Sequence, residues 1–420
     1  MSFTLKDVAA LDSFKKSSLL TTNCNLDREV NWIYLAETSP NLEKNFFKKN
    51  TEVLFFCVGH GASHNFFTLK DLVDDVYELK AAGLVFFLGR YIYEIPDEII
   101  AYCESLNLPV FTLPWEVSYI DVNKELTEQL IKRSLIEKGT QDLIHKILFE
   151  DDGDRNALVK MAQDNHINLK TSYFAYIISI DNYEILTSSI PEEIFDDIKS
   201  KLYNLVKSNS ELGHYSDMDI QNEDQIILII KDVDKNKFIE INQGDNNILK
   251  KLTRQINDYI KNKKYYMKPI SLTIGIGNST TDILSIKNSY LEGEKVISAR
   301  RRQLLVGKCI CYDDLGVYKL LFMIENSEII NSAYPDKLKK ILEYDNANDS
   351  TLIPTLEKYL ENQGSLIMTA EAMNIHKNTV TYRINKIKSL LDLDITKPKN
   401  IPIILMEIKA IRFMTSDHNR

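Results

Sequence analysis

The sequence predicts a multidomain α/β plus all-α protein, in which two α/β domains precede an all-α domain. Three observations carry this prediction. Apolar runs alternate with helix-periodic segments in the first 120 residues, and a similar alternation recurs between residues 170 and 315. From about residue 350 onward the strand-like runs stop and helical periodicity continues alone. A chain of 420 residues has the length of roughly two to four domains, each with its own core.

The composition is that of an ordinary globular protein, with 44% hydrophobic and 26% charged residues. Five cysteines without metal-ligand spacing fit a reducing cytoplasm. No apolar run has the length of a membrane span, and the N-terminus lacks the apolar core of a signal peptide. We therefore expect a cytoplasmic protein without a membrane segment, metal or cofactor. The net charge of −9 argues against a protein that covers nucleic acid non-specifically. Contacts with DNA therefore require basic residues that are concentrated in one part of the chain.

Residues 1–120 predict a parallel sheet with crossover helices. Short apolar runs at Glu52–Gly59, Gly83–Gly89 and Pro109–Leu113 are typical of buried strands. Between them, Thr68–Ala82 and Pro96–Leu106 have the features of helices. Because strand and helix alternate, the strands are expected to run parallel. A domain of this kind offers a small molecule a site at the carboxyl ends of its strands.

The loops at that edge contain three candidate effector-binding residues, His60, His64 and Arg90. Arg90 is the best suited to an anionic effector, because a guanidinium pairs bidentately with a carboxylate. A structural ion pair explains Arg90 equally well, and polar loop residues follow buried strands in many proteins. No acid, base and nucleophile converge by spacing, so we expect no catalytic site here.

Residues 121–169 predict a helical connector, and residues 170–315 predict a second α/β domain. Ser134 and Gly139 interrupt any heptad in Asp121–Glu150, so this helix either pairs with its copy in a dimer or packs on its own domain. The cluster Arg300–Arg302 suits a helix C-terminus, where cations are favourable. The predicted strands and helices of the second domain are Tyr173–Ile180, Gln225–Ile230 and Ser271–Gly277, and Glu192–Lys207, Asn246–Lys261 and Asp282–Arg302.

The stretch from Ser365 to Leu391 predicts a helix-turn-helix. Leu366–Met373 carries small and apolar residues at helical spacing, and Asn374 then suits a left-handed turn, which Asn tolerates better than most residues. Ile375 is expected to fill the corner between the helices. The apolar stripe of the second helix follows at i, i+4 and i+7, as Val380, Ile384 and Ile387.

The polar face of this second helix carries donors and cations, with no carboxylate between Asn374 and Ser389. Such a face suits a helix in the major groove of DNA, between two rows of phosphates. The alternative is a solvated amphipathic helix in an ordinary α-hairpin. The predicted DNA-contacting residues are His376, Lys377, Asn378, Thr379, Thr381, Tyr382, Arg383 and Lys386.

The predicted DNA-binding domain spans residues 350–415. Thr351–Leu360 is expected to be a supporting helix, and Ile401–Met414 a closing helix with Ile404, Ile408 and Ile411 on one face. The polar stretch Asp345–Ser350 predicts a linker to this domain.

Blocks of sequence at both ends of the chain are characteristic: LEKYLEN, TAEAMNIHKNTVTYRI and LLDLD near the C-terminus, and FTLKDVAALDSF and LGRYIYEIPDEIIAYCESLNLPVFTLPWEV near the N-terminus. Together they resemble the PucR-type transcription regulators, which are relatives of the sugar-diacid regulators. The resemblance implies an N-terminal sensing domain at residues 1–120 that binds an effector. It also implies a GGDEF-like middle domain at residues 170–315, related to cyclic-dinucleotide synthases.

The middle domain is expected to be a degenerate, non-catalytic form of such a synthase. Cyclases hold magnesium with carboxylates and need a glycine-rich turn beside the nucleotide. Here Ser179 stands where the first metal-binding Asp is expected, and the turn Gln221–Gln225 has no glycine pair and would crowd a nucleotide. We expect a spacer or dimerisation module, in which Asp181 and Glu223 serve turns and caps.

The sequence as a whole predicts a ligand-responsive, sequence-specific transcription regulator and not an enzyme. Its expected partners are double-stranded operator DNA, a small-molecule effector and a second copy of itself, in a homodimer or higher homo-oligomer. Its target would be a purine-catabolism or related metabolic operon. The competing interpretations are a nucleotide cyclase-like enzyme carrying a DNA-binding tail, and an adaptor that binds protein through its C-terminal helices.

Overall fold

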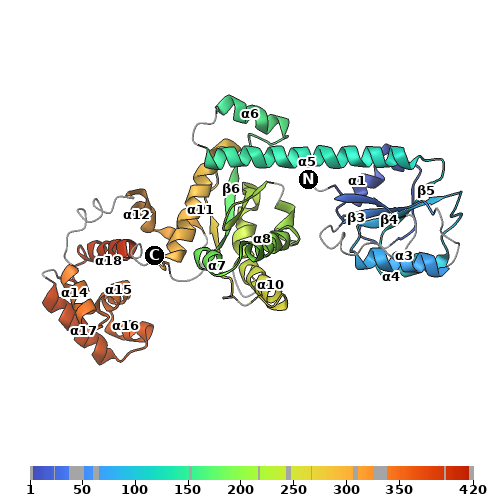
Figure 1. Cartoon of the computed structure of the whole chain (residues 1–420). Helices are drawn as coiled ribbons and strands as arrows, with labels where there is room; N and C mark the ends of the chain where they lie inside the picture. The colour runs from blue at the N-terminus through green and yellow to red at the C-terminus, as the bar shows by residue number, and fades with distance from the viewer. Residues whose placement is uncertain are drawn as a thin grey trace. The chain divides into compact units, whose positions relative to one another are not determined.

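The computed structural model describes residues 3–22, 24–36, 52–59, 66–150, 154–215, 218–242, 247–265, 267–305, 311–324, 338–391 and 394–415. They form two compact units, Met1–Asp142 and Leu143–Arg420. Many of their helices and strands are labelled in Figure 1. Among the described residues, no helix combines the length and the apolar character needed to cross a bilayer.

The described strands of the N-terminal unit form a five-stranded sheet in the order β1-β5-β4-β3-β2. The central pairs are parallel, which confirms the predicted parallel sheet. Its strands are β1 (Ser18–Leu19), β2 (Trp32–Leu35), β3 (Val53–Cys57), β4 (Gly83–Leu88) and β5 (Val110–Pro114). The helices around it are α1 (Leu5–Ala9), α3 (Phe66–Glu78), α4 (Asp97–Ser105) and the start of α5 (Tyr119–Phe149).

Helices cover both faces of this sheet, which explains why its central strands are continuously apolar. On one face, Phe55 and Phe86 pack with Val73 of α3 and Ile99 of α4. On the other face, the core contains residues of α1, β3, β4, β5 and the first turns of α5: Leu5, Val8, Leu54, Phe56, Val85, Phe87, Phe111, Val122 and Leu126.

Helix α5 contributes to the core of both units. Its 31 residues confirm the long helix predicted for Asp121–Glu150. Its last turns place Leu143 and Ile147 in the core of the second unit. In between, Ile131 and Leu135 are exposed, at 55% and 65% of their surface.

The second unit contains a four-stranded antiparallel sheet in the order β7-β8-β6-β9, among the described residues. The strands are β6 (Tyr173–Ile180), β7 (Asp219–Gln221), β8 (Gln225–Lys231) and β9 (Leu272–Ile276). The helices of this region are α6 (Arg155–Asp164), α7 (Tyr183–Ser189), α8 (Glu192–Lys207), α9 (Lys235–Glu240), α10 (Ile248–Asn262), α11 (Ile286–Arg301) and α12 (Tyr318–Ile324).

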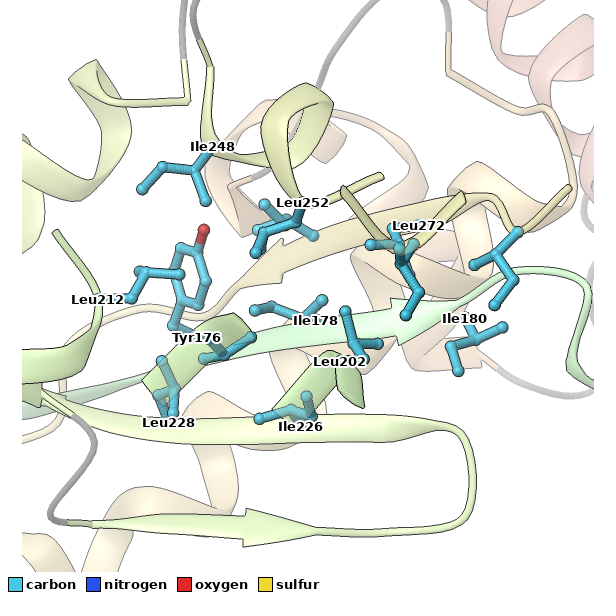
Figure 2. Close-up of a cluster of buried hydrophobic side chains, with 14 of the residues drawn as sticks. Tyr176, Ile178, Ile180, Leu202, Leu212, Ile226, Leu228, Ile248, Leu252 and Leu272 are labelled. Atoms are coloured by element: carbon cyan, nitrogen blue, oxygen red, sulfur yellow. The ribbon is translucent and has the colours of Figure 1, made fainter. Parts of the chain in front are cut away.

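All eight residues of β6 are buried, because the sheet is covered on both faces. Figure 2 shows Ile178 of β6 and Leu228 of β8 in one of the two cores, together with Leu202 of α8 and Leu252 of α10. On the opposite face, α11 approaches β9 closely. A Cβ atom on Gly275 of β9 would lie 2.4 Å from the carbonyl oxygen of Gly293 on α11, so a larger residue would separate helix and strand.

The C-terminal helices are α14 (Lys339–Asn348), α15 (Leu352–Glu361), α16 (Leu366–Met373), α17 (Lys377–Leu390) and α18 (Ile401–Thr415). The supporting and closing helices predicted from the sequence are therefore confirmed. Their core includes Leu356 and Leu360 of α15, Ala370 of α16, and Ile404 and Ile408 of α18.

The linker predicted at Asp345–Ser350 is wrong, because α14 extends through most of it and the side chain of Asp345 is buried. The two carboxylate oxygens of Asp345 accept hydrogen bonds from the backbone N–H groups of Leu352, at 2.8 Å, and Ile353, at 2.9 Å. These groups belong to the first turn of α15 and have no intrahelical acceptor. A polar segment that suggested a linker thus caps a helix.

Helix α18 also packs against the middle part of the unit. Its Ala410 and Phe413 share a core cluster with Val296 and Ala299 of α11 and with Leu321 of α12. The guanidinium carbon of Arg302 at the end of α11 lies 5.6 Å from the ring centroid of Phe322 and 5.1 Å from that of Phe413.

Candidate nucleic-acid interface

The turn between α16 and α17 has the backbone conformation that the sequence predicts. Asn374 adopts φ 51° and ψ 43°, which is left-handed, directly after the last residue of α16. The N–H of Ile375 then donates to the carbonyl of Ala370 at 3.0 Å. The N-cap of α17 is His376, whose Nδ1 accepts from the N–H of Asn378 at 3.2 Å. Local chemistry therefore fixes both the end of α16 and the start of α17.

The predicted apolar stripe fastens α17 to the domain. Val380 and Ile387 have no exposed surface, and Ile384 keeps 3%. All three lie in the same core cluster as residues of α14, α15 and α18. Since one face of α17 is fully buried, the opposite face is fixed in direction and points to solvent.

The solvent face of α17 contains most of the predicted DNA-contacting residues. His376, Lys377, Asn378, Thr379 and Tyr382 are exposed, and Tyr382 keeps 66% of its surface. Thr381, Arg383 and Lys386 are half-buried. The structure adds Asn385, which is exposed and continues the line of Asn378 and Tyr382 at i, i+4 and i+7.

The three half-buried residues have partners inside the domain. Nη1 of Arg383 donates to Oγ1 of Thr355 on α15 at 3.2 Å. Nζ of Lys386 lies 4.6 Å from the ring centroid of Tyr344 on α14. The hydroxyl of Thr381 donates to the carbonyl of Lys377 at 3.0 Å.

The partners of Arg383 and Lys386 were missed from the sequence because Thr355 and Tyr344 are far away along the chain. One signal was available for Arg383. It lies three residues after Val380 and four before Ile387, so helical spacing puts it beside the apolar stripe rather than opposite it.

Of the three candidate effector-binding residues, His60 and His64 lie outside the described residues, and Arg90 lies within them. Arg90 lies two residues after the end of β4, at the carboxyl edge of the parallel sheet. Its guanidinium carbon lies 5.2 Å from the ring centroids of both Tyr91 and Trp115. The described contacts of Arg90 are thus with aromatic rings, which hold its cation at the end of β4 and next to the end of β5.

In the middle domain, an arginine approaches Ser179, the residue expected to replace the first metal-binding Asp of a cyclase. Nη2 of Arg301 donates to Oγ of Ser179 at 2.6 Å and to the carbonyl of Ile180 at 3.2 Å, and it also ion-pairs with Asp224. Oδ2 of Asp181 accepts from the hydroxyl of Ser271 at 2.7 Å. Glu223 accepts a long hydrogen bond, 3.4 Å, from the hydroxyl of Tyr183.

Two protein-family models match the chain, one at each end. The Purine catabolism regulatory protein-like family matches residues 7–130, and the PucR C-terminal helix-turn-helix domain matches residues 352–410. The chain thus has a PucR-family domain match at each end. Neither match extends over residues 131–351, so the GGDEF-like assignment of the middle domain stays a prediction.

Two curated relatives share less than a quarter of their aligned residues with this chain. It is 24% identical over 215 residues to the DNA-binding transcriptional activator AdeR of Bacillus subtilis, covering 49% of this chain and 50% of AdeR. It is 22% identical over 264 residues to the proline-responsive transcriptional activator PutR of the same organism, covering 62% of this chain and 59% of PutR. The chain thus spans about half the length of these curated relatives.

A solved structure titled as a regulator of polyketide synthase expression from Bifidobacterium adolescentis is 14% identical and covers 68% of this chain and 100% of that one. Its TM-score of 0.25 is too low for a comparison of folds.

Proposed function

We propose that this PucR-type protein is a sequence-specific, DNA-binding transcription regulator. One observation carries the proposal: α17 presents an exposed, carboxylate-free face that begins at its first turn, behind a fixed left-handed turn at Asn374. In helix-turn-helix proteins it is the N-terminal part of the second helix that contacts base edges in the major groove. The relatives named as transcriptional activators support the same function.

In the proposed complex, the residues of α17 have two different tasks. Asn378 and Thr379 in the first turn reach base edges, and Tyr382 and Asn385 extend this line along the groove. Lys377 contacts phosphate, and Arg383 and Lys386 approach a phosphate row from the side of the helix that faces Thr355 and Tyr344. His376 and Thr381 complete the DNA-contacting set.

The test is a selection of bound duplexes from a randomised DNA pool by the purified full-length chain, followed by titration of the enriched duplex against a scrambled one. Enrichment of a shared sequence, with binding at least about tenfold tighter than to scrambled DNA, is the expected result. A pool without enrichment would contradict sequence-specific binding and would favour the adaptor function.

We also propose that the protein binds DNA as a dimer or higher homo-oligomer. A single recognition helix offers few base contacts, so useful affinity requires two half-sites. The exposed Ile131 and Leu135 on α5 make this helix a candidate contact between the copies. Light scattering that shows a monomer both free and on the selected duplex would refute this proposal.

The division of labour that we propose gives residues 1–120 the sensing role, 121–169 the role of connector and 350–415 DNA binding. The effector would bind at the carboxyl edge of the parallel sheet near Arg90, with His60 and His64 as further candidates. It would come from purine catabolism or a related metabolic pathway, and the name of the relative PutR gives proline as the signal for that protein.

Tryptophan fluorescence can test this site, because the chain has two tryptophans, Trp32 and Trp115. In a Trp32→Phe variant, the remaining indole lies beside Arg90 and should report a metabolite that binds there. Purine degradation products and amino acids form the first panel. The signal should disappear in the Arg90→Gln form of this variant.

We infer that residues 170–315 form a degenerate, GGDEF-like spacer or dimerisation module rather than a cyclase. The guanidinium of Arg301 beside Ser179 supports this inference, because a fixed cation opposes magnesium at the same position. Incubation of the full chain with GTP or ATP and magnesium should give no cyclic product. Turnover that is lost in an Asp181→Asn variant would establish the enzyme function instead.

A further inference from the structure

Helix α5 carries a row of six exposed side chains at coiled-coil spacing. The residues follow one another at intervals of four and three in alternation, as the a and d positions of a heptad do. Ile131 and Leu135 are at its centre, and Ser134 and Gly139, the residues expected to interrupt a heptad, lie outside it. The complete row, called here the α5 row, is Lys124, Glu128, Ile131, Leu135, Lys138 and Asp142.

The opposite side of α5 is fixed to the N-terminal unit. Leu126, Arg133 and Thr140 recur every seven residues on this side. Leu126 and Thr140 are buried. Arg133 donates a hydrogen bond to Oδ1 of Asn31 at 3.3 Å and ion-pairs with Glu29 at 3.7 Å. Because these contacts determine the rotation of the helix about its axis, the α5 row points to solvent.

The charges of the α5 row are complementary about its midpoint, which is position 133. The two apolar residues lie on either side of this position. Glu128 and Lys138, which are opposite in charge, both lie five residues from it. Lys124 and Asp142, which are also opposite in charge, both lie nine residues from it. A second copy of α5 in antiparallel orientation would therefore bring each residue of the row next to a residue that complements it.

A parallel pair of helices would bring like charges together instead. Each residue of the row would then meet its own copy, so that Glu128 would face Glu128 and Lys138 would face Lys138. Such contacts are unfavourable. In the antiparallel pair, Ile131 of one copy contacts Leu135 of the other on both sides of the twofold axis. The charge pattern therefore favours the antiparallel orientation.

The charged groups of the row remain accessible to a second copy. Nζ of Lys124 lies 4.0 Å from Oε1 of Glu128, but the two side chains keep 74% and 64% of their surface exposed. An exposed pair at this distance contributes little stability, and in the antiparallel pair both groups also meet Lys138 and Asp142. Lys132 flanks the row and would approach its own copy near the axis, but its long stem lets the ammonium group reach water.

We propose that two copies of the chain pair through the middle of α5 in antiparallel orientation. Ile131 and Leu135 form the apolar centre of the contact, and the complementary charged pairs at both ends fix its register. This inference rests on the proposed homodimer and specifies its contact surface. Because the apolar centre is short, the dimer should dissociate on dilution.

The oligomeric state of the full-length chain without DNA tests the contact. Sedimentation velocity over a concentration series should show a monomer–dimer equilibrium for wild type. Ile131→Ser and Leu135→Ser should each raise the dissociation constant at least about tenfold, because each removes two apolar side chains from the symmetric contact. The matched control is Ile120→Ser, since Ile120 is 75% exposed on the same helix but lies outside the row. This control should associate like wild type, and circular dichroism should show that all three variants remain folded.

A charge exchange tests the orientation. Glu128→Lys and Lys138→Glu should each weaken the dimer about fivefold or more, because each creates like-charged neighbours across the antiparallel contact. The double variant exchanges the two charges and should restore dimerisation. In a parallel pair, each single variant would only replace one like-charged contact by another, and the double variant would bring no recovery. Asp258→Lys on α10 changes the charge equally at an exposed position and should associate like wild type.

Three results would overturn the antiparallel contact. One is a wild-type chain that stays monomeric without DNA at every concentration. Another is a dimer that Ile131→Ser and Leu135→Ser leave unchanged, and the third is a double charge variant that associates no better than the single ones. The proposed homodimer would survive each of these results if the chain were still dimeric on the selected duplex, so the two proposals can fail separately.

Discussion

The carboxylate of Glu357 on α15 accepts a hydrogen bond from the ammonium group of Lys409 on α18 at 2.7 Å, although the side chain of Glu357 is only 3% exposed. Arg412 pairs with the second oxygen of the same carboxylate. Two cations of the closing helix are thus fixed to one buried acid of the supporting helix, within the domain that carries α17.

Removal of this acid should destabilise the C-terminal helices strongly. Glu357→Ala leaves Lys409 and Arg412 without their partner, and loss of one member of a buried pair costs about 3–5 kcal/mol. The free energy of opening is measured by hydrogen exchange of the amides in α15 and α18. The control is Glu361→Ala, whose side chain is 38% exposed and whose loss should cost less than about 1 kcal/mol. If Glu357→Ala and Glu361→Ala lowered the stability equally, the buried ion pairs of Glu357 would contribute no more stability than the exposed pair of Glu361.

The left-handed backbone of Asn374 predicts which substitutions at this position preserve the stability of the domain. Asn374→Gly should leave stability near that of wild type, because glycine adopts a positive φ without strain. Asn374→Val should lose about 1–2 kcal/mol, since a branched Cβ clashes in the left-handed region. Asn385→Val on the exposed face of α17 is the control, and it should change stability by only a few tenths of a kcal/mol. The measurement is again hydrogen exchange, here of the amides in α16 and α17.

Two neighbouring residues at the start of α17 should affect DNA binding differently. Lys377→Ala should weaken binding to the selected and the scrambled duplex alike and lower the salt slope by roughly 0.9. Asn378→Ala should cost about 1–3 kcal/mol on the selected duplex and little on the scrambled one. Titrations at several salt concentrations distinguish the two effects.

Lys386→Ala should behave like Lys377→Ala in this titration and also loosen the contact with Tyr344. Val380→Ala is the structural control, because it opens the core and should lower stability. If folded Lys377, Asn378 and Lys386 variants all bound the selected duplex like wild type, α17 would not be the reading helix.

Glu294 of α11 predicts a pH dependence. Burial raises the pKa of its carboxyl above the ordinary value of 4.5, against a smaller opposite effect of the hydrogen bond from Gln225. The folded state therefore holds this proton more tightly than the unfolded chain does. Stability is then lost as the pH rises from about 4.5 through the raised pKa of the folded state.

Glu294→Gln removes this ionisation and keeps an acceptor for Gln225. The variant should have a higher unfolding midpoint than wild type at neutral pH, and the difference should shrink towards acidic pH. The exposed Glu371→Gln on α16 serves as the control and should show no such trend. A wild-type protein that is more stable than Glu294→Gln at neutral pH would contradict the sign.

Features that depend on residues close together in the sequence could be predicted. The turn at Asn374 and the stripe of Val380, Ile384 and Ile387 depend on spacings of a few residues, and both are found in the structure. The same is true of β6, which is buried throughout and almost entirely apolar because both of its faces are covered.

Features that depend on distant partners were missed. The tether from Arg383 to Thr355 joins residues 28 positions apart. Strand β2 escaped notice because it is only partly buried, with Trp32 56% exposed. The segment around Asp345, which caps α15, resembled a linker. The sequence does not distinguish an aspartate that is buried and capping a helix from one that is exposed to solvent. The cavity of about 550 Å³ that Asp181, Asp224, Thr273 and Arg300–Gln303 line forms only where the ends of β6 and α11 meet β9.

Helix α18 belongs to two cores at once, through Ile404 and Ile408 on one side and Ala410 and Phe413 on the other. Unfolding of α18 therefore opens both cores, and both α11 and α17 lose packing when it unfolds. The two regions should behave as one cooperative unit in native-state exchange. The fluctuations of the recognition helix would then be set by the stability of a sheet to which it makes no contribution.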